Sequence, residues 1–263
     1  MKIIKLSINL LLISFVSFAS NSLFNVRDSV KAVASEKRSA PRQSQDSSES
    51  ENLDFSGYGR PGRRVGGGSR SLCPNTAKPL TALVPNSNVG MTVRDRPNFW
   101  FYVPYNPQQA ATGEFVLQDR QENDIYRQTF DLPQTPGLVS LNLPQAAPAL
   151  EVDRPYRWYF KLYCGDSTST TANFVEGWIT RIPLESDLAI EIEQGKNPDY
   201  QEYGSNSIWF DALDNLAQLR LEQDNPQLQN DWNRLLSAEG VNLGELSQQL
   251  LVGEVTNLGR ERK

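Results

Sequence analysis

The chain has 263 residues and a formal net charge of −5, with 38% hydrophobic and 22% charged residues. It contains no histidine and two cysteines, which excludes Ser-His and Cys-His nucleophiles, His-containing zinc or copper sites and a Cys-only zinc site. The acidic balance argues against a nucleic-acid backbone as the main partner. We therefore expect a protein that needs no cofactor and binds no nucleic acid.

The amino terminus has the pattern of an export signal. Lysines lie at positions 2 and 5, an apolar run extends to Phe18, and Ser17-Phe18-Ala19 fits the small-x-small cleavage rule. Cleavage there makes residues 1–19 a signal peptide, with an alternative site near residue 34. A single membrane anchor is the other interpretation, but the run is short for a span of about 20 residues. We expect export to the periplasm, envelope or exterior, with no transmembrane segment after signal removal.

Polar composition marks the next stretch. Residues 20–56 are expected to be a disordered linker, because their Ser-, Glu-, Gln- and Arg-rich part almost lacks apolar side chains. Residues 57–72 form a Gly/Arg-rich lead-in, either a flexible connector or a tether for an anionic polymer or surface. The candidate tether residues are Arg60, Arg63, Arg64 and Arg70.

Residues 73–182 show the pattern of a β domain. Short apolar runs alternate with Pro, Gly, Asn and Asp breaks, at a spacing of about 10–14 residues. This spacing predicts an antiparallel β-sandwich of the immunoglobulin or fibronectin type. We expect strands over residues 80–84, 90–93, 98–103, 114–118, 125–130, 138–143, 156–164 and 174–181.

The strand predicted over 156–164 alternates strictly. One face carries Tyr156, Trp158, Phe160, Leu162 and Cys164, and the other carries the basic and aromatic residues Arg157, Tyr159, Lys161 and Tyr163. If exposed, the second face suits a sugar chain, an acidic peptide or a partner protein. If covered, its tyrosines belong to a core beneath helices, which is the interpretation that we favour.

Two further features support a sandwich. The segment from Leu150 to Tyr156 resembles a tyrosine corner, in which a tyrosine hydroxyl bonds to the backbone upstream, although the usual Pro-Gly step is absent. Residues 99–103 and 174–179 are apolar on both strand faces, so something must cover the outer face of their sheets.

Cys73 and Cys164 are the only thiols. An even pair in an oxidising compartment most often forms a disulfide, and closing a loop of about 90 residues would stabilise the fold by roughly 4 kcal/mol. Two buried free thiols are the alternative. A redox-active pair is disfavoured, because such cysteines usually lie two residues apart.

Residues 183–252 are expected to be helical. Apolar residues at helical spacing predict helices near 209–219 and 226–236, a helix or strand over 184–192, and a last short helix over 242–250. We expect these helices to pack on one outer sheet face, the alternative being a separate helical domain. Residues 253–263 are predicted to be a flexible tail.

An ordered set of segments covers much of residues 57–251. It comprises Gly59-Arg-Pro-Gly-Arg-Arg64, Leu80-Thr-Ala-Leu-Val-Pro85, Phe99-Trp-Phe-Tyr-Val-Pro-Tyr105, Glu114-Phe-Val-Leu-Gln118, Trp158-Tyr-Phe-Lys-Leu-Tyr-Cys164, Glu176-Gly-Trp-Ile179 and Ile208-Trp-Phe-Asp-Ala-Leu213. Together they resemble a secreted cyanobacterial family, the domain of unknown function 928 family. The resemblance implies export, a two-cysteine pattern, strands followed by helices and an envelope partner. It implies no activity, cofactor or catalytic residue.

Carboxylates are the remaining candidates for chemistry. A glycosidase needs two that face each other across a cleft, and a calcium loop could use those between residues 119 and 124. A solvated hairpin loop and surface acids are the alternatives that we favour, so we assign no catalytic or metal residue. The candidates are Glu114, Asp119, Glu122, Asp124, Glu151, Asp153, Glu176 and Asp211.

The sequence thus favours a non-enzymatic binding or assembly module of the cell envelope, with an envelope protein or polysaccharide as partner. The alternative is a carbohydrate-active hydrolase that uses paired carboxylates.

Overall fold

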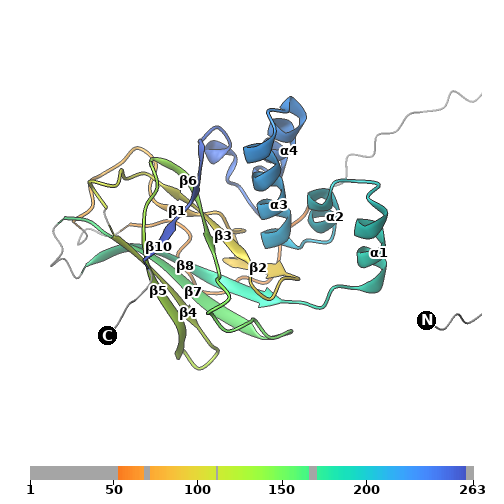
Figure 1. Cartoon of the computed structure of the whole chain (residues 1–263), viewed down its shortest axis with the longest axis horizontal. Coiled ribbons are helices and arrows are strands. Elements are labelled where there is room, and N and C mark those ends of the chain that lie inside the picture. The colour runs from red at the N-terminus through yellow and green to blue at the C-terminus, as the bar shows by residue number, and fades with distance from the viewer. Residues whose placement is uncertain (1–52, 68–71, 111, 166–170, 259–263) are drawn as a thin grey trace, which may run out of the picture. The chain divides into compact units, whose positions relative to one another are not determined.

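A computed structural model describes residues 53–67, 72–110, 112–165 and 171–258 of the chain. The predicted signal peptide, most of the predicted linker and Arg70 lie outside these residues. Strands come first along the chain and helices follow, as expected (Figure 1). The strands are β1 (Thr81–Ala82), β2 (Val89–Thr92), β3 (Asn98–Val103), β4 (Thr112–Gln118), β5 (Asp124–Asp131), β6 (Gly137–Asn142), β7 (Pro155–Tyr163), β8 (Ala172–Arg181), β9 (Leu251–Glu254) and β10 (Thr256–Leu258).

The strands form two sheets that share an aromatic core. One sheet has the order β1-β3-β6-β9, and the other has the order β10-β5-β4-β7-β8-β2. Most pairs are antiparallel, but β2 pairs with β8 and β9 pairs with β6 in parallel. Between the sheets, Phe101 of β3 stacks on Phe160 of β7 at 3.9 Å between ring centroids, and Phe99 lies 4.9 Å from Phe115 of β4. The predicted β-sandwich is confirmed.

The alternation predicted for β7 is also confirmed, because Tyr156, Trp158 and Phe160 are buried while the residues between them are half-buried. The corner ahead of this strand forms as well. The Glu151 N–H donates a hydrogen bond of 3.1 Å to the Tyr156 hydroxyl oxygen. This bond holds the chain where it enters β7, without the Pro-Gly step of the common motif.

Four helices follow the eight strands of the predicted β domain. The prediction over 242–250 is wrong, because only one 3₁₀ turn forms there before the chain enters β9. A seven-residue helix was not predicted, since so short a segment carries no periodic apolar stripe. The helices are α1 (Ser186–Gln194), α2 (Asp199–Ser205), α3 (Trp209–Glu222) and α4 (Pro226–Leu236), with the 3₁₀ turn η1 (Gly244–Leu246) after them.

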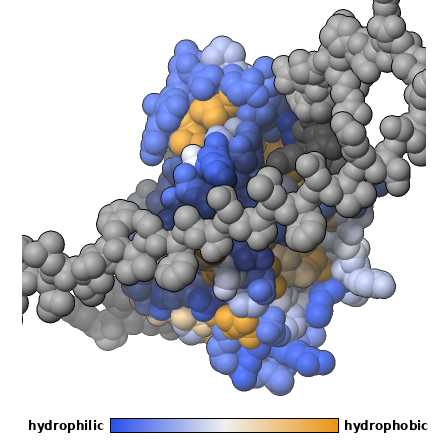
Figure 2. Space-filling view, turned by 90° about the vertical axis from the view of Figure 1, so that its right-hand side faces the viewer, coloured by the Kyte–Doolittle hydropathy of each residue, from blue (hydrophilic) through white to orange (hydrophobic). Residues whose placement is uncertain are grey.

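α3 packs against β3 of the four-stranded sheet and against β2 at the edge of the six-stranded sheet, and the other helices lie beside it at this end of the sandwich (Figure 1). Phe99 and Phe101 face the core, so Trp100 between them faces outward, yet it is only 1% exposed. Its indole N–H donates to Asp214 of α3 at 3.0 Å, and the Trp209 indole donates to the Leu83 carbonyl at 2.9 Å. Strands and helices are therefore one unit, as predicted. Figure 2 shows the helical end of the molecule, where the coloured surface is mostly hydrophilic with separate small hydrophobic patches.

The structure is ordered over residues 53–67, which we call the strap, although part of this segment was predicted to be disordered. Phe55 is buried and meets the Trp209 ring edge-on at 4.9 Å, so the predicted disordered linker is wrong for residues 53–56. Further along, Arg63 pairs with Glu176 of β8 and Val65 with Thr81 of β1. The strap thus joins one sheet to the other. Its order comes from backbone hydrogen bonds to strand edges, which a Gly- and Arg-rich composition does not reveal.

The carboxyl-terminal segment forms two strands, β9 and β10, where the sequence predicted a flexible tail from residue 253 onward. Residues 253–258 were expected to be a flexible tail, but β9 pairs with β6 and β10 pairs with β5. Val255 between them is buried, and its N–H donates to the Ser140 carbonyl at 2.9 Å. This segment also passes from one sheet to the other, so the strap and the carboxyl-terminal strands close different sides of the sandwich.

Cys73 and Cys164 form the predicted disulfide. The bond ties the segment before β1 to the end of β7, across 91 positions of sequence. Within the described ranges, no helix is long and apolar enough to cross a membrane.

Candidate ligand-binding surface

The outer face of the six-stranded sheet carries the basic and aromatic residues of β7. None of the described helices lies over β4, β5 or β7, so the favoured interpretation of a helix-covered face is wrong (Figure 1). The four residues are half-buried by their neighbours on the sheet instead. We call them the β7 quartet: Arg157, Tyr159, Lys161 and Tyr163.

Glutamates on both neighbouring strands pair with the quartet. Arg157 lies 2.6 Å from Glu176 of β8, and Lys161 lies 3.1 Å from Glu114 of β4. Arg127 of β5 also reaches Glu114, at 2.6 Å. Burial by itself raises the pKa of Glu114, but hydrogen bonds from Arg127 and Lys161 outweigh it and lower the pKa. Glu114 therefore stays ionised at neutral pH as part of a charge network.

The two tyrosines of the quartet remain neutral hydrogen-bonding groups. Burial and the nearby Glu176 carboxylate raise the pKa of Tyr159 to about 12. Burial and Glu114 likewise raise the pKa of Tyr163. The Tyr159 ring also makes cation–π contacts with two residues of the quartet. The Arg157 guanidinium lies 5.0 Å and the Lys161 ammonium 5.6 Å from the ring centroid.

The strap adds two of the predicted tether residues to this face. Arg60 lies over the Trp178 ring at 4.7 Å, and Arg63 lies over the Phe174 ring at 4.5 Å. The Trp178 indole N–H donates to the Pro61 carbonyl at 2.8 Å, which fastens the strap to β8. Both side chains belong to exposed residues, and neither has a carboxylate within ion-pair distance among the described residues.

Arg64 points away from this surface. Its guanidinium donates to the Val84 carbonyl at 3.3 Å, the Val241 carbonyl at 2.5 Å and the Asn242 carbonyl at 3.4 Å. Burial lowers its pKa. Arg64 therefore joins the strap, the sandwich and the segment after α4. Of the four candidate tether residues, the structure brings Arg60 and Arg63 together with the β7 quartet.

The other acidic candidates serve local structure. Asp119 accepts hydrogen bonds from the Gln121 and Asn123 N–H groups, each at 2.9 Å, and these bonds hold the β4–β5 hairpin loop. No group of three or more potential metal ligands occurs in the part of the chain that the structure describes. Asp124, at the start of β5, forms an ion pair with Arg127, and Glu122 lies in the loop just before it.

Three of the candidates line a surface cavity of about 470 Å³ between the β4–β5 loop and the loop before β7. They are Asp119, Glu151 and Asp153. Glu151 pairs with Arg154 at 2.8 Å, and hydrogen bonds within its own loop lower the pKa of Asp119. Burial raises the pKa of Asp211, but that side chain is inaccessible, lies 3.3 Å from Arg94 and does not line this cavity.

Several residues of this surface were not predicted from the sequence. Trp178, Phe174 and Arg127 were not among the candidates. The alternation of β8 does place Phe174, Glu176 and Trp178 on one face, but alternation does not say which face of a sheet stays open.

Fold and surface together define a disulfide-tied β-sandwich with helices on one sheet and a basic, aromatic face on the other. The chain belongs to the family described as Domain of Unknown Function (DUF928), whose model matches residues 65–251. The match includes the β7 quartet and both cysteines, and it begins after Arg60 and Arg63. No curated protein matches the chain.

Proposed function

We propose that this chain is an exported, non-catalytic binding module of a cyanobacterial cell envelope, and that it holds an anionic partner on the outer face of the six-stranded sheet. One observation carries the proposal. Arg60 and Arg63 are stacked on Trp178 and Phe174, exposed and without a carboxylate partner among the described residues.

The local charge favours an anion. The Trp178 ring has two guanidinium groups within reach, Arg60 at 4.7 Å and Arg157 at 5.7 Å, and Arg63 pairs through its backbone with the neighbouring Glu176. Arg60, Arg63 and Arg157 thus supply three guanidinium groups here, against the carboxylates of Glu176 and of Glu122, which lies 3.8 Å from Arg157, although the whole chain has a net charge of −5. This part of the face is therefore positive on an acidic protein.

Stacking prepares these groups for binding. A guanidinium over an aromatic ring loses part of its freedom before any ligand arrives, and the Arg63 guanidinium is held further by its bond of 2.9 Å to the Gly67 carbonyl. The remaining N–H groups can bind a carboxylate, sulfate or phosphate. Lower ordering cost on binding means higher affinity from the same contacts.

Export is supported by the signal-like sequence of residues 1–19 and by the disulfide, since such bonds persist in oxidising compartments. An envelope location would place the basic face among acidic polysaccharides and envelope proteins.

The test is binding of the chain without residues 1–19 to a polyanion such as polygalacturonate. Replacing both Arg60 and Arg63 by alanine should weaken binding at least about tenfold, which corresponds to the loss of roughly one charge-assisted hydrogen bond. Binding to neutral dextran should be undetectable, and binding to polygalacturonate should weaken with added salt.

The matched control replaces two exposed cations elsewhere, Arg120 in the β4–β5 loop and Lys196 after α1, with the same change in net charge. It should bind like the unmodified chain. Equal losses in both double variants would show that net charge alone drives binding and would contradict the proposal.

A further inference from the structure

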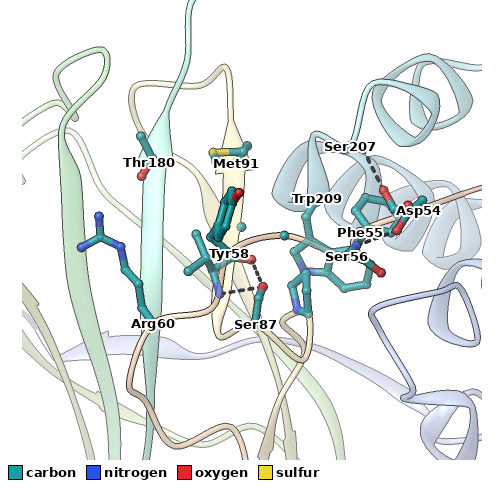
Figure 3. Close-up of a pocket in the computed structure, with 14 residues that line it drawn as sticks. Asp54, Phe55, Ser56, Tyr58, Arg60, Ser87, Met91, Thr180, Ser207 and Trp209 are labelled. Carbon is teal, nitrogen blue, oxygen red and sulfur yellow. Dashed lines mark hydrogen bonds between the residues drawn. The ribbon is translucent and has the colours of Figure 1, made fainter.

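The strap crosses a cavity of about 390 Å³ beside β2 (Figure 3). One end of the crossing is held by buried Phe55, and the other by the Arg60 N–H, which donates to the Ser87 carbonyl at 2.9 Å. Between these points lies Gly57-Tyr58-Gly59, with Tyr58 at 101% relative exposure. A wholly exposed tyrosine at the mouth of a cavity has no role in stabilising the fold, so its ring is free to contact a ligand.

The cavity has ends of opposite charge. Figure 3 shows Arg60 on one side of Tyr58 and Asp54 on the other, with Met91 and Thr180 beside the tyrosine. Asp54 accepts the Ser56 N–H through one oxygen at 2.7 Å, and this bond lowers its pKa, so the carboxylate is ionised and its second oxygen can accept from a ligand. Arg60 lines the opposite end, where its guanidinium lies over the neighbouring Trp178 ring and has no carboxylate partner among the described residues.

Between these ends the lining combines apolar groups with hydroxyl groups. Val89 and Met91 of β2 supply the apolar part, while Ser87, Thr180 and Ser207 supply hydroxyl groups. The volume is near the lower limit of about 300 Å³ for small-molecule sites, which suits one or two rings. A ligand that matches all of these features has an anionic group, several hydroxyl groups and one apolar ring face.

We propose that this cavity binds one hexuronate ring of an acidic polysaccharide. The sugar carboxylate pairs with Arg60, and the apolar C–H face of the ring stacks on Tyr58 beside Thr180, while Asp54 on the other side of Tyr58 accepts from the hydroxyl groups of the adjoining ring. A fully apolar ligand would leave Asp54 and Arg60 without partners, and a neutral sugar would not use Arg60.

This inference rests on the proposed function, because Arg60 belongs to both places. Its guanidinium lies over Trp178 on the outer sheet face, and the same residue lines the cavity. A polymer seated with one ring in the cavity would therefore continue directly onto the arginine-rich face, where Arg63 and the β7 quartet meet its following carboxylates.

Calorimetric titration of a short oligogalacturonate into the chain without residues 1–19 tests the inference. Tyr58→Ala should weaken binding about tenfold, as expected for the loss of a ring contact, and Tyr58→Phe should lose far less affinity because it keeps the ring. Replacement of exposed Leu250 by alanine is the matched control and should leave binding unchanged. A neutral malto-oligosaccharide of equal length should bind at least about tenfold more weakly than the oligogalacturonate.

The variants separate the two proposals. If Arg63→Ala weakens binding while Tyr58→Ala binds like the unmodified chain, the sheet face binds the polyanion and the cavity assignment is overturned. If Tyr58→Ala weakens binding while Arg63→Ala does not, the cavity holds the sugar and the role of the sheet face fails. Equal binding of the neutral sugar overturns the hexuronate assignment.

Discussion

Asp214 of α3 shows how a single residue joins the two halves of the fold. It is 2% exposed, yet its carboxylate accepts hydrogen bonds from Arg94 at 2.8 Å, Asn98 at 2.9 Å and the Trp100 indole at 3.0 Å. A buried carboxylate is tolerated only when such partners replace its hydration. The polar face of α3 therefore points partly toward the sandwich, where it orients the helix on β3.

Asp214→Ala should lower the free energy of unfolding by about 3 kcal/mol, because it leaves the buried indole and amide donors unpaired and removes one of the two carboxylates that pair with Arg94. Chemical denaturation followed by circular dichroism measures the change. Glu222→Ala, at an exposed position of the same helix, is the control and should stay within about 0.5 kcal/mol of the unmodified chain. Similar effects of the two substitutions would contradict the role given to the buried network.

At the scale of elements, the strap is the part that makes the sandwich and the helices one body. Its amino-terminal end packs Phe55 against Trp209 of α3, and the Phe55 N–H donates to the Glu239 carbonyl beyond α4 at 3.0 Å. Its other end pairs with β8 and β1. An open strand edge invites pairing with other chains, so the strap also protects these edges.

Phe55→Ala should destabilise the protein by about 3–4 kcal/mol, as for other buried phenylalanines, because it leaves a cavity against Trp209. Thermal unfolding measures this effect. Tyr58→Ala, three residues further along the same strap, should leave the melting temperature unchanged because that ring is fully exposed. A strap that contributes nothing to stability would show no difference between the two variants.

The whole molecule is asymmetric about its core. α3 packs on the outer side of β3 and on the edge strand β2, while the outer face of β4, β7 and β8 carries charge networks and stacked arginines. A sheet whose two faces are both apolar must be covered, whereas a mixed face can meet solvent or a partner. The disulfide at the end of β7 links this second sheet to the segment that leads into β1.

Replacing both Cys73 and Cys164 by serine should lower the free energy of unfolding by about 4–5 kcal/mol, the loop-entropy value for a separation of 91 residues. Denaturant titration measures the loss, and the unmodified chain unfolded in the presence of a reducing agent should show the same midpoint as the double variant. A loss below about 1 kcal/mol would mean that the denatured chain is not restrained by the bond.

The sequence alone determined what depends on local periodicity. Alternation identified β7, short apolar runs between turn residues identified β3 and β8, a helical stripe with an Asn225-Pro226 start identified α4, and the lone pair of cysteines identified the disulfide. Only the tertiary structure decided what depends on partners far away in the chain. The strap and β10 carry no periodic apolar pattern, because their order comes from backbone hydrogen bonds to strand edges that any side chain allows. Which sheet face the helices cover was likewise decided by contacts such as that of Trp100 with Asp214, more than a hundred residues apart. The candidate binding surface exists because the helices pack on β3 and β2 and leave β4, β5 and β7 uncovered, and no local pattern in the sequence of β7 contains that information.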